Sequence, residues 1–135
     1  MKQECIQESK DKLIVFQENR SKITIVNKNE AKISRVKVDG CAITTGVRCD
    51  YLLLSNNIEY FIELKGQDIS HAVKQLGASI DILSKSTDTK VSFIICRRGP
   101  MNSPKIQVLR AKFKKKYRFD LIIKSSPFKY TLGKQ

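Results

Sequence analysis

Long hydrophobic runs are absent from this sequence of 135 residues. No stretch approaches the roughly 18 apolar residues that a membrane-spanning helix requires. The opening residues, MKQECIQESK, also lack the apolar core of a signal peptide. Internal repeats and low-complexity linkers are missing as well, so we expect a single domain over residues 1–135, located in the cytoplasm and without contact to a membrane.

Residues that bind zinc are scarce. The chain has one histidine and four cysteines, and no two cysteines are spaced as in a C-x-x-C motif. A zinc site is therefore not expected. We predict that the cysteines are free thiols in a reducing cytoplasm, with Cys41 and Cys49 packed as small hydrophobic side chains.

Acidic residues are half as frequent as basic ones. The chain has 26 Lys and Arg against 13 Asp and Glu, which gives a net charge of +13. Such an excess attracts nucleic acid, an anionic membrane surface or an acidic protein. From Lys105 to Arg118 there are seven basic residues and no acidic one. We predict that basic side chains in and before this stretch bind nucleic acid, namely Arg97, Arg98, Lys112, Lys114, Lys115 and Lys116. The alternative for the lysines of this stretch is a solvated helix face.

The first half of the chain has the pattern of β-strands. Short alternating runs predict strands at residues 13–16, 23–26 and 33–43, and the residues before Asp11 are open to a helical interpretation. Two apolar runs then follow, at residues 51–54 and 60–62, joined by Ser55-Asn56-Asn57. They predict a hairpin of well-buried strands.

The second half alternates helix and strand. Apolar residues at helical spacing predict a helix over residues 69–84, with Asp68 or Ser70 as its N-cap. A buried strand over residues 91–96 follows, and the order strand, helix, strand predicts a parallel crossover. Pro104 opens a second helix that reaches about residue 117, before a strand at residues 119–123. The predicted class is α/β, with a mixed central β-sheet flanked by helices.

Three charged residues interrupt the apolar hairpin. Glu63 and Lys65 are two apart and share one face of their strand, and antiparallel pairing brings Asp50 beside the Lys65 end. Carboxylates are hard oxygen ligands that suit Mg²⁺ or Mn²⁺. A metal-activated water and a neighbouring lysine are the groups that phosphodiester hydrolysis needs.

The same residues carry a resemblance to a known family. Residues 48–54, residues 60–66 and the helix with Gln75-Leu76 resemble the core of the PD-(D/E)XK nuclease superfamily, which includes restriction endonucleases and archaeal Holliday-junction resolvases. The resemblance covers residues 33–96 and implies a restriction-endonuclease-like fold. It implies that Asp50 and Glu63 are metal ligands, that Lys65 positions the water, and that Gln75 supports catalysis. The alternative for Gln75 is an exposed helix residue.

One element of the family pattern has no secure counterpart here. Many members place a further acidic ligand upstream; Glu30 is the nearest candidate for this metal ligand, with Glu18 and Glu8 behind it. Without such a residue the site would bind one metal ion or be inactive. Cys49 also stands where the motif's name has proline, a common substitution.

These features predict a Mg²⁺- or Mn²⁺-dependent endonuclease that acts on DNA, with RNA as a possible substrate. So short a chain shows no dedicated recognition domain, which favours structure-selective or partner-directed cleavage. Cutting two strands favours a homodimer. The alternatives are a catalytically inactive nuclease-fold protein that binds nucleic acid, and a basic adaptor that docks on an acidic protein.

Overall fold

The structure is a computed structural model. It describes all residues except 19, 66–67, 86–87, 98–102 and 134–135, and also leaves out the side chain of Lys65. The described part contains two helices, α1 (Ile69–Leu83) and α2 (Pro104–Tyr117), and a 3-10 turn, η1 (Gln3–Cys5). None of its helices is long and apolar enough to span a membrane.

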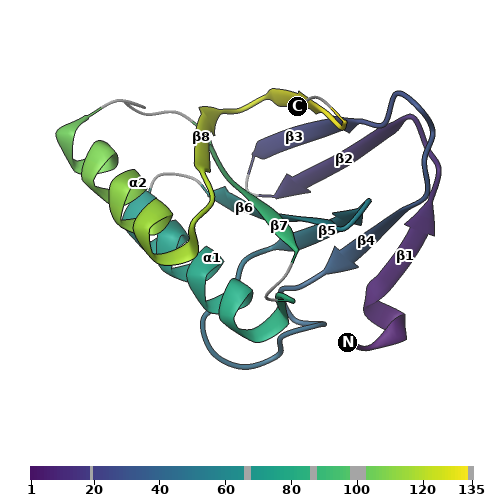
Figure 1. Cartoon of the computed structure of the whole chain (residues 1–135), viewed down its shortest axis with the longest axis horizontal. Coiled ribbons are helices and arrows are strands. Elements are labelled where there is room, and N and C mark those ends of the chain that lie inside the picture. The colour runs from purple at the N-terminus through teal and green to yellow at the C-terminus, as the bar shows by residue number, and fades with distance from the viewer. Residues whose placement is uncertain (19, 66–67, 86–87, 98–102, 134–135) are drawn as a thin grey trace.

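The strands form two sheets (Figure 1). The larger sheet has six strands, in this order across the sheet: β1 (Ile6–Ser9), β4 (Ile33–Lys37), β5 (Tyr51–Ser55), β6 (Ile58–Lys65), β7 (Thr89–Cys96) and β8 (Leu121–Ser125). The smaller sheet has three: β2 (Leu13–Glu18), β3 (Ser21–Val26) and β9 (Phe128–Thr131). Within the larger sheet, β6, β7 and β8 run parallel and the other pairs run antiparallel.

The predicted hairpin is confirmed. Strands β5 and β6 pair antiparallel, and only Asn56 and Asn57 lie between them, with φ angles of 49° and 62°. Two consecutive residues at positive φ make the tight turn whose twist matches paired strands, and asparagine tolerates that conformation better than most residues. The turn sets the register in which Tyr51 faces Ile62.

Both predicted helices are confirmed. The N-cap of α1 is Asp68, whose side chain accepts a hydrogen bond from the backbone N–H of His71. Along the chain, α1 connects β6 to β7, and these two strands pair parallel, as the predicted crossover requires. Ser103 caps α2, and Pro104 occupies its first turn.

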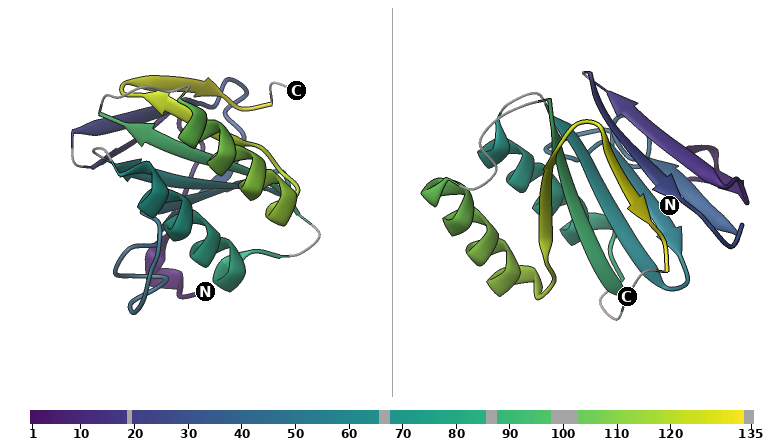
Figure 2. Two further views of the ribbon diagram at one scale, coloured as in Figure 1. Left: turned by 90° about the vertical axis from the view of Figure 1, so that its left-hand side faces the viewer. Right: turned by 90° about the horizontal axis from the view of Figure 1, so that it is seen from above.

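The layers differ in one respect from the prediction. Figure 2 shows both helices on one side of the larger sheet, where their apolar faces pack on residues such as Leu52, Phe61 and Ile94. The smaller sheet covers the opposite face, where Phe16 and Ile25 join its side of the core. The α/β class with a mixed sheet is therefore observed, but helices flank only one face. The short strand β9, parallel to β3, has no counterpart in the prediction.

Two local predictions were wrong. Strand β4 ends at Lys37 and does not reach residue 43, because the chain turns at Gly40, where φ is 78°. Cys5 and Cys41, 36 residues apart, form a disulfide with a Cα–Cα distance of 5.6 Å. Only Cys49 and Cys96 are free thiols, both buried. The prediction of a reducing compartment rested on four free thiols, so the disulfide removes its basis.

Candidate active site

The larger sheet brings Asp50 and Glu63 together. Because Tyr51 faces Ile62, Asp50 lies opposite Glu63 at the next position of the pairing. The backbone N–H of Asp50 donates to Ile62 O at 3.2 Å, and Asp50 Oδ2 accepts from the Leu64 N–H at 2.9 Å. The side chains of Asp50 and Glu63 lie within hydrogen-bonding reach of each other. The fold therefore places two carboxyls in direct contact, on the sheet face that α1 covers.

Burial makes this contact electrostatically demanding. Glu63 is only 2% exposed, and Asp50 is partly buried. Burial raises the pKa of Asp50, and the nearby carboxylates of Glu18 and Asp39 add to that rise, whereas the hydrogen bonds with the Leu64 N–H and the Glu63 side chain lower it. Burial and the nearby carboxylates therefore disfavour the charged form of Asp50 unless a cation compensates its charge.

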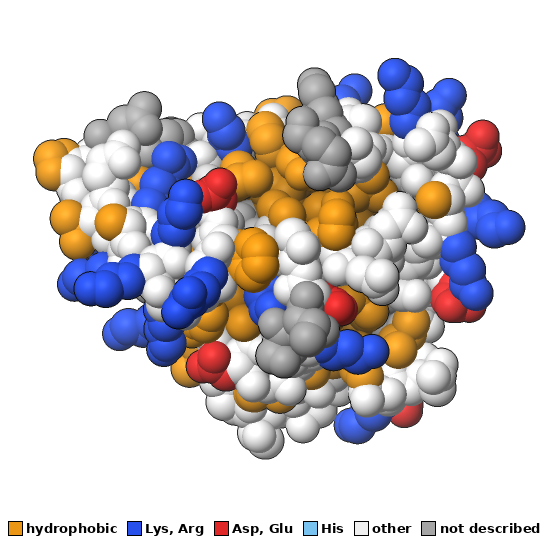
Figure 3. Space-filling view, viewed as in Figure 1, with side chains coloured by type: hydrophobic (Ala, Val, Ile, Leu, Met, Phe, Trp, Pro, Cys, Tyr) orange, Lys and Arg blue, Asp and Glu red, His pale blue; other side chains and the backbone are white. Residues whose placement is uncertain are grey.

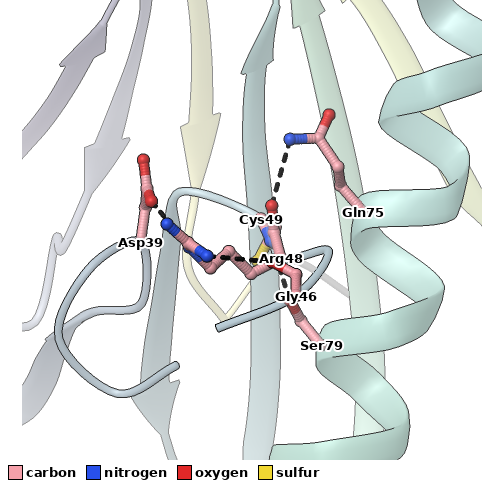
Figure 4. Close-up of polar contacts among 6 residues, drawn as sticks. All are labelled: Asp39, Gly46, Arg48, Cys49, Gln75 and Ser79. Atoms are coloured by element: carbon pink, nitrogen blue, oxygen red, sulfur yellow. Dashed lines mark hydrogen bonds and ion pairs between the residues drawn. The ribbon is translucent and has the colours of Figure 1, made fainter. Parts of the chain in front are cut away.

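Helix α1 holds the chain that leads into Asp50 (Figure 4). Gln75 Nε2 donates to Arg48 O at 3.0 Å, and the Cys49 N–H donates to Ser79 Oγ at 2.8 Å. Gln75 and Ser79 are four residues apart and so lie on one face of the helix. Burial raises the pKa of the Cys49 thiol to about 12, which keeps this side chain neutral beside the two carboxyls. These contacts fix the backbone just before Asp50.

A loop with an ion pair borders the site. Arg48 Nε lies 2.8 Å from Asp39 Oδ1, and Arg48 Nη1 donates to Gly46 O at 2.9 Å. The Asp39 N–H approaches Asp50 O at 3.3 Å. Asp39 and a partly exposed guanidinium are therefore held next to the Asp50 backbone.

The structure does not bring Glu30 or Glu8 to the pair. Glu30 is exposed in the connection before β4, and Glu8 faces Ser34, which in turn faces Leu54 near the hairpin turn. Asp50 lies beyond the other end of β4 and β5, next to Val38. The full length of β4 thus separates both residues from Asp50.

The carboxylate that approaches from upstream is Glu18. Its Oε2 accepts a hydrogen bond from Tyr51 Oη at 2.7 Å, and its charge raises the pKa of Asp50. The sequence alone favours Glu30 over Glu18 for this position. No local pattern distinguishes the two, since Glu18 reaches Tyr51 only because the smaller sheet folds over β5 and β6.

The basic residues divide between two places. Arg97 is exposed and directly follows β7, at the end where Cys96 pairs with Lys65. The lysines at 112 and 114–116 lie on the later turns of α2, whereas the beginning of that helix follows the site end of β7. Arg98 lies outside the described residues, as does the side chain of Lys65.

The donor set fits a divalent cation that keeps its waters. Within the described residues, no three His, Cys, Asp or Glu side chains are grouped closely enough to hold a metal ion. Magnesium sites, however, often use one or two carboxylates and retain several waters. Gln75 Oε1 is buried and has no hydrogen-bond partner in the part of the chain that the structure describes, so it could accept from such a water. Asp50, Glu63 and Gln75 would together supply only hard oxygen atoms.

Comparison with known proteins adds no relative. No protein family, no curated protein and no solved structure matches this chain. Any functional interpretation therefore depends on the site's own geometry and chemistry.

Proposed function

We propose that this protein is a Mg²⁺- or Mn²⁺-dependent nuclease that hydrolyses phosphodiester bonds in DNA, with a PD-(D/E)XK-like site made of Asp50, Glu63 and Lys65. The observation that carries this proposal is the contact between the carboxyls of Asp50 and Glu63, set by the register of β5 and β6. Two carboxyls held together with little exposure to water are costly for a fold. A cation-binding role explains why they are held there.

Each residue has a defined part in this proposal. A divalent cation bound there would supply an activated water and neutralise charge that develops on the phosphate. The Leu64 N–H orients the Asp50 carboxylate at 2.9 Å. Gln75 holds the Arg48 carbonyl with its amide nitrogen and offers Oε1 to a water. Lys65 follows Glu63 by two residues and is proposed to orient the attacking water.

The test is cleavage of a panel of labelled DNA and RNA: single strands, duplexes, flaps and four-way junctions. Wild-type protein should cut at least one DNA substrate with Mg²⁺ or Mn²⁺ and none with EDTA. Asp50→Asn, Glu63→Gln and Lys65→Ala should each lose most of this activity. Asp11→Asn removes an exposed acid in the β1–β2 connection and serves as the matched control. Equal cleavage by Asp50→Asn and Asp11→Asn would exclude the proposed site.

The competing functions give different results in the same samples. A catalytically inactive nuclease-fold module binds DNA but shows neither cleavage nor a metal response that depends on Asp50. A basic adaptor for an acidic protein shows no DNA affinity that declines with salt. We propose that the active form is a homodimer, since cutting both strands of a duplex needs two sites. Sedimentation with and without DNA measures that state.

A further inference from the structure

A groove runs along the outer edge of the larger sheet, between α2 and β8. Strand β8 is the last strand of this sheet, so one of its edges has no partner strand in the described part of the chain. The groove has a volume of about 500 Å³. Figure 3 shows lysine and arginine side chains gathered over α2, at the left of the view. The charged residues that line the groove are Arg110, Lys114, Asp120 and Lys124.

Two of its cations have no acidic partner. Lys114 Nζ forms an ion pair with Asp120 at 3.0 Å. Among the described residues, no carboxylate forms an ion pair with Arg110 or Lys124. Lys124 Nζ lies 6.0 Å from the centroid of the Phe128 ring. The groove therefore has uncompensated positive charge.

Arg110 also has hydrogen-bonding capacity to spare. Its Nη2 donates to Ile123 O at 3.4 Å, which is a long bond, and its Nε is buried without a partner within the described residues. A guanidinium has five N–H donors in a planar fork that matches the oxygens of a phosphate. Arg110 thus favours an anionic ligand with several acceptor oxygens.

The groove is aligned with the candidate active site. Glu63 pairs with Ile94, and Ile94 pairs with Ile123, whose carbonyl accepts from Arg110. Two strand spacings of about 4.8 Å separate the backbones of Glu63 and Ile123, or roughly 10 Å in all. This distance corresponds to about three steps of duplex DNA at 3.4 Å rise per step.

The other flank of α2 is less suited to phosphates. Lys112 and Lys116 line a groove against α1, but Tyr117 and Phe113 also line it. Lys116 Nζ lies 5.3 Å from the centroid of the Tyr117 ring, and that ring packs over Gly77. Apolar and aromatic groups thus take up much of this surface.

We infer that the α2–β8 groove binds the phosphate backbone of a nucleic acid, with Arg110 and Lys124 as its principal contacts. The inference rests on the proposed function for its ligand class, and it adds a binding site that the run of lysines alone did not indicate. The groove anchors the strand beside the site, and Asp50 and Glu63 act on a phosphate a few nucleotides away.

The test measures binding of fluorescein-labelled DNA, 20 nucleotides or base pairs long, by anisotropy in EDTA. The test variant is Arg110→Gln with Lys124→Gln. The matched control is Lys10→Gln with Lys12→Gln, which removes the same charge next to β1, the opposite edge strand. We expect the test variant to weaken affinity at least tenfold and to lower the slope of log Kd against log[salt] by about 1.4–1.8, the loss of two phosphate contacts. The control should change affinity less than threefold.

Equal losses in the two double variants would overturn the inference, because net charge alone would then explain binding. No loss in either would overturn it as well. Lys124→Gln alone leaves the bond from Arg110 to Ile123 in place, so its affinity and thermal stability separate lost contacts from lost folding. A labelled glutamate peptide that binds more tightly than DNA, and loses this affinity in the test variant, would assign the groove to an acidic protein instead.

The test also separates this inference from the proposed nuclease. Since EDTA prevents cleavage, binding is scored without activity. If the protein never cuts DNA but the test variant loses DNA affinity, the groove is a binding site and the proposed nuclease activity is refuted. If the protein cuts DNA normally but the test and control variants bind DNA equally well, the nuclease proposal stands and the groove is not the binding site.

Discussion

Replacing Asp50 with asparagine should stabilise the metal-free protein and abolish its stabilisation by divalent cations. The Asp50 carboxyl is partly buried and lies near the carboxylates of Glu18 and Asp39, which raise its pKa, whereas an asparagine oxygen still accepts from the Leu64 N–H. Relief of an unfavourable charge at a functional site typically yields about 1 kcal/mol. Unfolding entropy of about 2.1 cal/mol/K per residue gives roughly 0.28 kcal/mol/K for 135 residues, so we expect Tm to rise by about 3–4 °C.

Divalent cations should stabilise the wild-type protein but not Asp50→Asn. At a Mn²⁺ concentration of about 100 times Kd, binding to the folded state alone adds about 2.7 kcal/mol of stability. On the same entropy scale the Tm of the wild-type protein rises by about 9–10 °C. Asp50→Asn should show little of this rise, and the control Asp11→Asn should show all of it. Scanning fluorimetry or calorimetry, with EDTA or with Mn²⁺, measures both effects.

The stability difference between Asp50→Asn and the wild-type protein should depend on pH. Burial raises the pKa of Asp50 in the folded state, so ionisation opposes folding as pH rises through that folded pKa. Below the ordinary aspartate pKa of about 3.9, the carboxyl is protonated in both states and the penalty disappears. The advantage of Asp50→Asn should therefore be present at pH 7 and shrink toward pH 4. A variant less stable than wild type at pH 7 in EDTA, or one that keeps the Mn²⁺ shift, would refute the reasoning.

Three further predictions address the surroundings of the site. Glu18→Gln should reduce the Mn²⁺-induced Tm shift and the cleavage rate more than Glu30→Gln does, and the reverse order would restore Glu30 as the upstream ligand. Gln75→Ala leaves a carbonyl unpaired and should lower activity about 10–100-fold, with DNA affinity in EDTA retained; a parallel loss of affinity would indicate a purely structural role. Replacing Cys5 and Cys41 with serine should lower the free energy of unfolding by about 3–4 kcal/mol, given a separation of 36 residues, and reduction of the wild-type protein should have a similar effect on Tm.

Local patterns predicted local structure well. The hairpin around Asn56-Asn57, the cap at Asp68 and the start at Pro104 all follow from the preferences of a few neighbouring residues. The pairing of β9 with β3 does not, because it joins segments about a hundred residues apart and neither run is long enough to specify its partner. The disulfide escaped for a similar reason, since cysteine positions do not by themselves reveal connectivity.

The same division applies to the candidate site. Asp50 and Glu63 meet because of a hairpin register, which a two-residue turn determines, so their contact could be anticipated from the residues between them. Glu18 could not be anticipated, because its approach depends on how the smaller sheet packs on the larger one. The hydrogen bonds of Gln75 and Ser79 to the chain before Asp50 could not be predicted either, because they depend on where α1 packs on the sheet.

The two candidate functional surfaces share one rigid element, which makes their spacing a property of the core. Strand β7 lies between the strand that carries Glu63 and the strand whose carbonyl holds Arg110, and Phe93 and Ile94 on β7 are fully buried. Buried strands of a parallel sheet do not slide, because a slip of one residue would turn every apolar side chain to the wrong face. Since the roughly 10 Å between the backbones of Glu63 and Ile123 cannot adapt to the ligand, selectivity would come from which nucleic acid can present phosphates to both surfaces at once. Such a rigid spacing favours recognition of shape over recognition of base sequence.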